Sequence, residues 1–157
     1  MADRVAREKQ QIRGPHQRPG TIKDVSERIF QQVYKKYQRL LATERLWDFE
    51  DLIYTVVTKM NTSPEMVKQF QYRFQYIFVD EYQDVNTGQY QIVRLLSPQD
   101  NNLCVIGDPD QSIYGWRGAD IRNILEFERH FKDAKVFRLE QNYRSTKSIL
   151  AGADSGI

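Results

Sequence analysis

Hydrophobic residues recur at helical spacing through the first half of the chain. Between residues 21 and 41 they fall three or four positions apart, as on one face of an α-helix, and Thr21 with Asp24 resembles a capping arrangement. Asp48 is predicted to cap a second helix, and Ser63-Pro64 predicts the start of a third that runs to about residue 74. The apolar positions are Val25, Ile29, Val33, Tyr37, Leu40 and Leu41 in the first helix, and Phe49, Leu52, Ile53, Val56 and Val57 on the inner face of the second.

The hydrophobic period changes after residue 75. Short β-branched and aromatic runs at 76–79 and 103–106 are predicted as buried strands, and residues 136–139 as a third strand. Residues 87–97 and 120–131 have helical spacing, and Ser145 is predicted to cap a final helix. Strands that alternate with helices imply an α/β fold with a parallel sheet.

The composition is that of an ordinary globular protein. The 157 residues are 40% hydrophobic and 28% charged, which suits one domain or slightly more. No apolar run is long enough to span a membrane, and the charged N-terminus lacks a signal-peptide pattern, so the sequence predicts a cytoplasmic protein. A single cysteine, Cys104, and two histidines exclude an internal disulfide and a Cys/His zinc site.

Charge is distributed unevenly along the chain. Residues 1–47 carry a net charge of +6 and residues 48–157 a net charge of −4. The basic end favours a polyanionic partner such as nucleic acid, although a run of charge is also typical of a solvated surface. Residues 1–20 are polar and basic and contain Gly14-Pro15 and Pro19-Gly20, so they are predicted to form a flexible, irregular lead.

Polar clusters follow each predicted strand. Asp80 and Glu81 come after the first strand, residues 107–111 after the second and residues 141–144 after the third. In a parallel sheet these three strand ends converge on one edge, where ligands bind. Adjacent acids can divide two tasks of phosphoryl transfer, because one can hold a hard cation while the other takes a proton from water. Taken alone, the acid pair also fits a solvated loop or a helix cap.

Three longer strings of residues make the interpretation specific. They are FVDEYQDVN at 78–86, VIGDPDQSIYGWRGA at 105–119 and LEQNYRST at 139–146. In this order they resemble motifs II, III and IV of the UvrD/Rep family of superfamily 1 DNA helicases. The string WDFEDL at 47–52 resembles the point where that family re-enters its first RecA-like domain after an inserted helical subdomain.

The resemblance covers about residues 21–155 and implies a domain organisation. Residues 21–46 would be the end of the inserted helical subdomain, and residues 47–157 part of the first RecA-like ATP-binding domain. The expected fold is therefore a partial RecA-like parallel sheet with flanking helices, of the P-loop NTPase type, preceded by a mainly helical segment. The implied activity is ATP hydrolysis coupled to 3′ to 5′ translocation on single-stranded DNA and unwinding of duplex DNA, in repair or replication.

The resemblance also implies roles for individual residues. Asp80 would hold Mg²⁺ and Glu81 would act as the general base for the water that attacks ATP. Gln111 would sense the γ-phosphate, Tyr143 would stack on adenine and Arg144 would reach the γ-phosphate. The residue types suit these roles, because carboxylates bind Mg²⁺ and arginine neutralises transition-state charge.

Single-stranded DNA and its junctions with duplex are the implied partners. Tyr114 and Trp116 would contact bases, with Arg117 beside them, since aromatic faces stack on any base. The alternative is that Tyr114 and Trp116 are core aromatics, that Tyr143 only packs and that Gln111 only stabilises its loop.

One expected motif is not found in this sequence. None of the eight glycines is followed by lysine, so the chain has no Walker A loop, and the strand leading to such a loop is also expected to be absent. We therefore expect a fragment that needs further helicase segments, including a second RecA-like domain, and that hydrolyses no ATP alone. The alternatives are a non-catalytic module that binds single-stranded DNA or a protein, and a truncated, inactive gene product.

Overall fold

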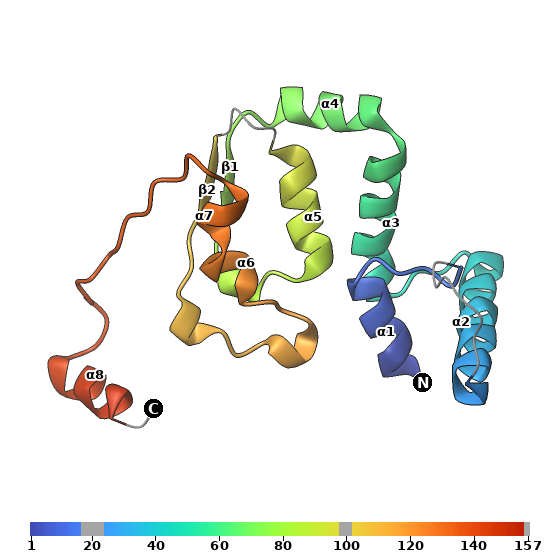
Figure 1. The fold of residues 1–157 in the computed structure, drawn as a ribbon, viewed down its shortest axis with the longest axis horizontal. Coiled ribbons are helices and arrows are strands. Elements are labelled where there is room, and N and C mark those ends of the chain that lie inside the picture. Colours follow the sequence, from blue (N-terminus) through green and yellow to red (C-terminus); the bar gives the residue numbers. More distant parts are fainter. Residues whose placement is uncertain (17–23, 98–101, 156–157) are drawn as a thin grey trace.

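The computed structural model describes residues 1–16, 24–97 and 102–155, apart from the side chain of Asp154. It is rich in helix and contains a small parallel sheet, consistent with an α/β fold (Figure 1). The elements are α1 (Ala2–Gln10), α2 (Val25–Glu44), α3 (Phe49–Thr62), α4 (Pro64–Arg73), β1 (Ile77–Val79), the 3-10 turn η1 (Tyr82–Asp84), α5 (Thr87–Leu96), β2 (Leu103–Val105), the 3-10 turns η2 (Pro109–Gln111) and η3 (Gly115–Arg117), α6 (Arg122–Leu125), α7 (Phe127–His130) and α8 (Lys147–Asp154).

Two helices begin with reciprocal capping interactions. Asp48 accepts a hydrogen bond from the backbone N–H of Asp51 at 2.8 Å, and Asp51 accepts one from the N–H of Asp48 at 3.2 Å. Asn86 and Gln89 repeat this arrangement at the start of α5, at 2.9 and 3.0 Å. Each pair satisfies two backbone donors that a helix start leaves free, so these starts are determined locally. The predicted cap at Asp48 is confirmed.

The other predicted helix starts differ in detail. Asp24 caps α2 through a bond from a backbone N–H, whereas Thr21 lies outside the described residues. Ser63 occupies the cap position of α4 but makes no capping hydrogen bond through its side chain. The cap residue of α8 is Thr146, one position after the predicted Ser145. The helices themselves therefore agree with the hydrophobic pattern better than their first residues do.

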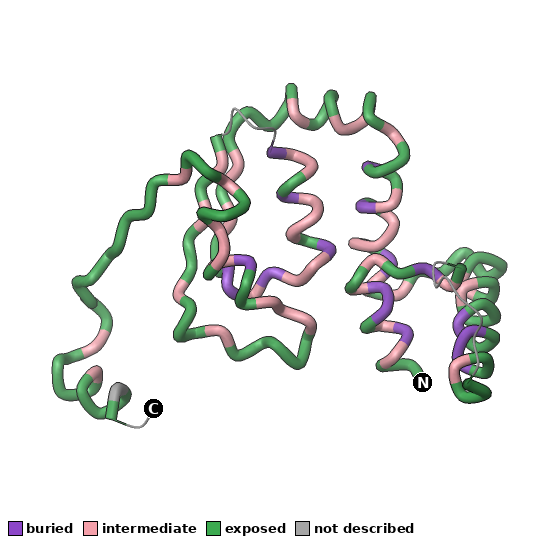
Figure 2. Tube along the Cα trace, in the orientation of Figure 1, coloured by how far each residue is buried: buried purple, intermediate pink, exposed green. Residues whose placement is uncertain are grey.

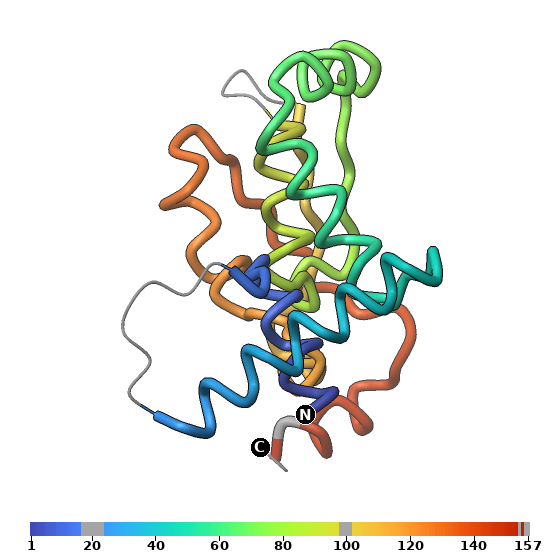
Figure 3. Tube along the Cα trace, turned by 90° about the vertical axis from the view of Figure 1, so that its right-hand side faces the viewer, coloured from blue at the N-terminus to red at the C-terminus, as the bar shows by residue number. Residues whose placement is uncertain are grey.

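The N-terminal residues form a helix where the sequence predicts an irregular lead. Helix α1 packs Val5 against Phe30 and Tyr34 of α2, and all three side chains are buried. Figure 3 shows α2 crossing α1 at a slant. The prediction of an irregular segment is wrong for α1. The buried face of this helix includes Glu8 and Lys9, so the sequence lacks the apolar periodicity by which a helix is predicted.

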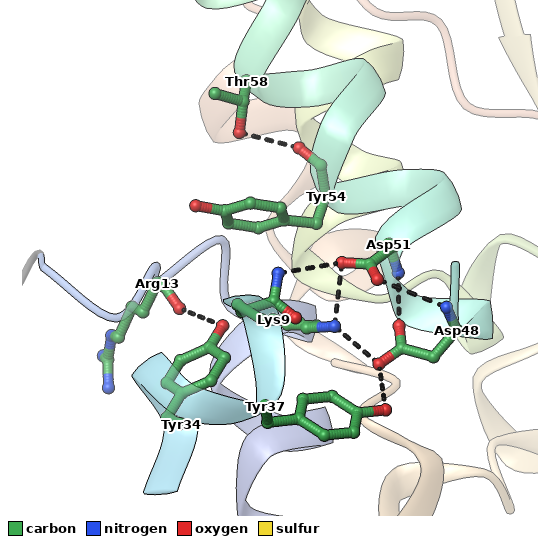
Figure 4. A network of polar contacts seen from close by, with 9 residues as sticks. Lys9, Arg13, Tyr34, Tyr37, Asp48, Asp51, Tyr54 and Thr58 are labelled. Carbon is green, nitrogen blue, oxygen red and sulfur yellow. Dashed lines mark hydrogen bonds and ion pairs between the residues drawn. The ribbon is translucent and has the colours of Figure 1, made fainter. Parts of the chain in front are cut away.

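Lys9 is fully buried and joins α1 to the start of α3. Its Nζ lies 2.5 Å from Asp48 Oδ2 and 2.8 Å from Asp51 Oδ1, and 5.1 Å from the centre of the Tyr37 ring (Figure 4). The hydroxyl of Tyr37 donates to the same Asp48 oxygen at 2.8 Å. The two carboxylates that start α3 therefore also anchor α1.

This network changes the pKa of two groups. Burial by itself would raise the pKa of Asp48, but hydrogen bonds from Lys9 and Tyr37 and the positive charge of Lys9 outweigh it and hold the pKa below its ordinary value. The hydrogen bond to Asp48, together with burial, raises the pKa of Tyr37 to about 12. Asp48 is therefore ionised, and Tyr37 protonated, at neutral pH.

Much of the apolar surface predicted as buried is exposed (Figure 2). On α2 the buried aromatic residues lie one position beyond the predicted apolar face, because α1 packs against that neighbouring side. On α3 only Val57 of the predicted inner face is buried. The exposed members of the two predicted faces are Val25, Ile29, Val33, Tyr37, Leu40, Phe49, Leu52 and Val56.

The first two of the three predicted strands form and pair in parallel, with Ile77 opposite Leu103 and Val79 opposite Val105. They are not fully buried as predicted. The central residues of the two strands, Phe78 and Cys104, point to an exposed face. This parallel pair agrees with an α/β fold, and its RecA-like architecture stays a prediction.

The third predicted strand does not form. Residues 136–139 belong to no strand, and the side chain of Leu139 is 93% exposed. After α7 the chain leaves the sheet and runs to α8, away from the other elements (Figure 1). Within the described residues β1 pairs only with β2, and no backbone hydrogen bond joins residues 136–139 to either strand, so their backbone groups lack the partners that a strand needs.

None of the helices in the described ranges has both the length and the apolar character needed to cross a bilayer.

We expect Lys9→Met to lower the free energy of unfolding by about 3 kcal/mol at pH 7, because it leaves Asp48 and Asp51 without their buried cation. Asp48 has a lower pKa in the folded than in the unfolded chain, so its contribution is complete above about pH 4 and is lost as the pH falls further. The difference between wild type and variant should therefore shrink in acid.

Urea unfolding followed by circular dichroism at pH 7 and pH 3 measures this difference. Lys36→Met, at an exposed position of α2, is the control and should leave the free energy unchanged. Equal losses in the two variants would contradict the assigned role of Lys9.

Candidate functional site

Two loops meet where β1 and β2 end. The backbone N–H of Ile106 donates to Val79 O at 2.8 Å, and the N–H of Tyr82 donates to Ile106 O at 2.9 Å. These bonds continue the parallel ladder past the strands, so the loop after β1 and the loop after β2 leave the sheet side by side. The first two predicted polar clusters are thus brought together.

The acid pair lies in a sharp turn at the end of β1. Glu81 has a left-handed backbone conformation, with φ of 49° and ψ of 44°, which is unfavourable for a residue with a side chain. One oxygen of Asp80 accepts the backbone N–H of Glu81 at 2.9 Å. Both acids are exposed. The turn therefore presents the two carboxylates to solvent at the edge of the sheet.

The residue whose side chain joins the two loops is Gln83, to which the helicase resemblance assigns no role. Its side chain is 1% exposed, its amide nitrogen donates to Glu81 Oε2 at 2.7 Å, and its amide oxygen accepts the N–H of Asp108 at 3.1 Å. Its backbone carbonyl also accepts the hydroxyl of Ser112 at 3.4 Å. In the sequence, the position of Gln83 between the acids of the string at 78–86 is the indication that it could belong to the site. Only the fold shows that its side chain is buried.

Gln111 lies on the second loop and is oriented by Asp108. Its amide nitrogen donates to Asp108 Oδ2 at 2.8 Å, while Asp108 Oδ1 accepts the N–H of Asp110 at 3.0 Å. Gln111 is exposed, so its side chain remains accessible to a ligand. A continuous line of hydrogen bonds therefore runs from Glu81 through Gln83 and Asp108 to Gln111.

The predicted DNA-binding residues form an exposed aromatic group. The ring centres of Tyr114 and Trp116 lie 6.5 Å apart, and the guanidinium of Arg117 lies 5.8 Å and 5.3 Å from those rings. Trp116 is 77% exposed, which contradicts the alternative that it is a core aromatic. Gly118 closes this turn with φ of 89°, a conformation that favours glycine.

The aromatic loop is attached to the acid-bearing loop. Ala119 forms an antiparallel bridge with Asn86, and the N–H of Asp120 donates to Val85 O at 3.2 Å. The buried side chain of Asn123 donates to the same carbonyl at 2.9 Å. The distance between the acid pair and the aromatic group is therefore set by direct contacts.

Tyr143 and Arg144 are not brought to this site. Both are exposed, Tyr143 by 90%, and they lie on the segment that leads away to α8. There the backbone N–H of Arg144 makes a local hydrogen bond to Asn142 Oδ1 at 2.8 Å. The structure therefore gives two of the three predicted clusters a common location.

An open hollow of about 400 Å³ adjoins the acid pair. Its polar wall contains Asp80, Glu81 and Asp84, and its apolar wall contains Ile92 and Val93 of α5. Asp84 Oδ1 is buried there without a hydrogen-bond partner among the described residues.

Tyr82 follows the acid pair in the loop after β1, and its side chain is buried. Burial raises its pKa to about 12, with a contribution from Tyr90 in the same direction and an opposing one from Arg94. Its ring meets that of Phe127 edge to face at 5.7 Å. Tyr82 is thus a protonated packing residue that supports the turn from within.

The acids fit one mode of magnesium binding. Among the described residues no three His, Cys, Asp or Glu side chains converge on a metal position. Mg²⁺, however, is commonly held by one or two carboxylates together with waters and substrate phosphates. Asp80 is exposed and uses one oxygen for the turn, so its other oxygen suits that mode.

Comparison with known proteins agrees with the motif strings. The family model for the UvrD/REP helicase N-terminal domain matches residues 1–132. The chain belongs to this family. It is 49% identical over 149 residues to the ATP-dependent DNA helicase PcrA of Staphylococcus epidermidis and 48% identical to that of Staphylococcus aureus, with 95% of this chain covered in each case.

The UvrD/REP match begins at residue 1, earlier than the resemblance at about residue 21 indicates. Helix α1 is therefore part of the family region, in agreement with its packing against α2 and α3. The chain spans about a fifth of the length of the curated PcrA relatives that it matches.

We expect Gly107→Ala to lower the free energy of unfolding by about 1–3 kcal/mol. A Cβ at this position would lie 2.7 Å from Gln83 Oε1 and 2.8 Å from Ile124 Cδ1, so the bridge between the loops must shift. Gly115→Ala is the control, because nothing lies within 4 Å of its Cβ position. Thermal unfolding should show almost no change for Gly115→Ala, and equal losses for the two variants would contradict the close packing at Gln83.

Proposed function

We propose that this chain is the part of an ATP-dependent DNA helicase that carries its hydrolytic carboxylates and one DNA-contacting loop. The observation that carries the proposal is the hydrogen-bonded line from Glu81 to Gln111, with the aromatic group attached beside it. An arrangement of this kind can couple events at a phosphate to contacts with DNA. The two staphylococcal relatives are ATP-dependent DNA helicases, which supports the same activity for this chain.

At the hydrolytic end we assign Asp80 to Mg²⁺ and Glu81 to the attacking water as general base. When bound, the cation would neutralise charge on the phosphates. Glu81 is suited to its role because its carboxylate is exposed and its orientation is restrained by Gln83. Gln111 would contact the γ-phosphate and transmit its loss through Asp108.

Tyr143 and Arg144 keep their proposed contacts with adenine and the γ-phosphate. For those contacts the segment before α8 must approach the strand ends, since the structure holds it apart from them. ATP hydrolysis also needs a phosphate-binding loop, and this sequence has no lysine after a glycine. We therefore propose that further helicase segments complete the site and that the chain by itself hydrolyses no ATP above background.

At the DNA end we assign base stacking to Tyr114 and Trp116 and a supporting contact to Arg117. Their exposure suits stacking on successive bases of a single strand, which needs no sequence preference. We propose translocation from 3′ to 5′, action at junctions between single- and double-stranded DNA in repair or replication, and a cytoplasmic location.

A second candidate is a non-catalytic module for single-stranded DNA. The aromatic group favours it, because exposed rings can stack on bases without any step of ATP hydrolysis. Single-turnover measurement of ATP hydrolysis separates the candidates when further helicase segments are supplied: the helicase proposal requires hydrolysis, and the binding module does not.

We expect Glu81→Gln to lower kcat for ATP roughly 100- to 10,000-fold, the usual range for a general base. The test protein is a chimera in which this chain replaces the matching segment of Staphylococcus epidermidis PcrA. ATP binding should change little, because the amide has nearly the size of the carboxylate. Glu65→Gln on α4 is the control and should leave kcat unchanged. Full activity in the Glu81→Gln chimera would exclude Glu81 as the base.

In the same chimera Trp116→Ala should weaken binding to single-stranded DNA by about 1–3 kcal/mol, with little dependence on base sequence. The melting temperature should hardly change, because the ring is mostly exposed. Tyr72→Ala, which removes an exposed aromatic from α4, is the control and should retain affinity. Fluorescence anisotropy with labelled oligonucleotides measures the affinities, and wild-type affinity for Trp116→Ala would contradict the stacking role.

A further inference from the structure

Among the residues that the structure describes, Gln83 is the one fully buried polar side chain that touches a proposed catalytic group. Its side chain is 1% exposed, although it follows the exposed Glu81 by only two positions. Burying an amide is unfavourable unless its donor and its acceptor both find partners. Here both do, and the partners belong to two different loops.

The neighbours determine the orientation of this amide. The backbone N–H of Asp108 can only donate, so the amide oxygen of Gln83 faces it at 3.1 Å. The amide nitrogen then faces Glu81 Oε2 at 2.7 Å, where a carboxylate accepts. A hydrogen bond to a charged acceptor is stronger than one between neutral groups. Glu81 is thus held by a donor that is itself anchored to the loop after β2.

The loop after β2 also carries Gln111, which Asp108 orients through its side chain. A displacement of Asp108 would therefore act on Gln111 through the carboxylate and on Gln83 through the backbone N–H. Gln83 is the only residue in this line whose side chain reaches across from one loop to the other. It can pass a movement of the second loop to the carboxylate of Glu81.

We propose that Gln83 is a positioning residue, which orients Glu81 for reaction and couples that orientation to the loop of Gln111. The inference rests on the proposed function, because it takes Glu81 as the general base. Misplacement of a reacting group by about 1 Å can cost roughly 100-fold in rate. Loss of Gln83 should thus reduce turnover without removing any group that contacts ATP.

The test uses the chimera with PcrA and compares Gln83→Met, Glu81→Gln and the double variant. Gln83→Met should lower kcat by about 10- to 100-fold and leave the KM for ATP within about twofold of wild type. In the Glu81→Gln background the same change should cause no further loss, because there is no carboxylate left to position. A purely structural role would instead reduce activity by the same factor in both backgrounds.

Gln83→Glu provides a second variant if methionine disturbs folding. It has the size of glutamine and still accepts the N–H of Asp108, but it replaces the donor to Glu81 with a like charge. Its kcat should fall at least as far as that of Gln83→Met. Gln71→Met is the matched control, since Gln71 also bridges two elements, donating to Leu95 O at 2.8 Å, but lies away from the acid pair. It should keep the wild-type kcat.

The outcomes separate the two proposals. If Glu81→Gln lowers kcat and Gln83→Met does not, or if the two losses multiply in the double variant, the positioning role is overturned and the proposed function stands. An equal loss in Gln71→Met would also overturn the positioning role. If Glu81→Gln keeps full turnover, the proposed base is wrong and the inference falls with it.

Discussion

Parallel pairing of β1 with β2 is the constraint on which the candidate site depends. Only in a parallel register do both strands end at the same edge, so that Asp80 and Ile106 leave the sheet together. The ladder continues into the loops through the bonds between Ile106, Val79 and Tyr82. This continuation brings Gln83 within reach of Asp108, and the line of hydrogen bonds from Glu81 to Gln111 depends on it. Three residues per strand are therefore enough to organise a site.

Two buried polar side chains connect parts of the chain that are distant in sequence. Lys9 joins α1 to the cap of α3 across 39 positions, and Gln83 joins the two loops across 25. Such groups add little net stability, but each is costly to leave without its partners. They therefore select one arrangement of the loops and helices over its alternatives. In this protein they are placed where α1 docks and where the candidate catalytic carboxylate lies.

Unlike these buried polar side chains, many apolar side chains of the chain remain exposed. One face of α2, one face of the short sheet and the segment 136–139 are exposed, although their residue types are those of a core. Local capping and hydrogen bonding within the helix keep α2 regular without full burial. The 136–139 segment cannot be regular by the same means, because a strand needs a partner for its backbone groups. An exposed apolar segment therefore forms a regular helix in α2, whereas the apolar residues 136–139 form no strand.

The amino-acid sequence by itself determined most helices, both paired strands, the family and the residues at the strand ends, because periodicity, capping and motif wording are local properties. The exposure of Trp116 agrees with its position in a loop rich in glycine and aspartate. Tertiary structure alone decided that α1 forms around a buried Lys9, that 136–139 remains unpaired and that Gln83 links two loops. Each of these depends on partners remote in sequence, and burial of a charge or an amide leaves no periodic signal.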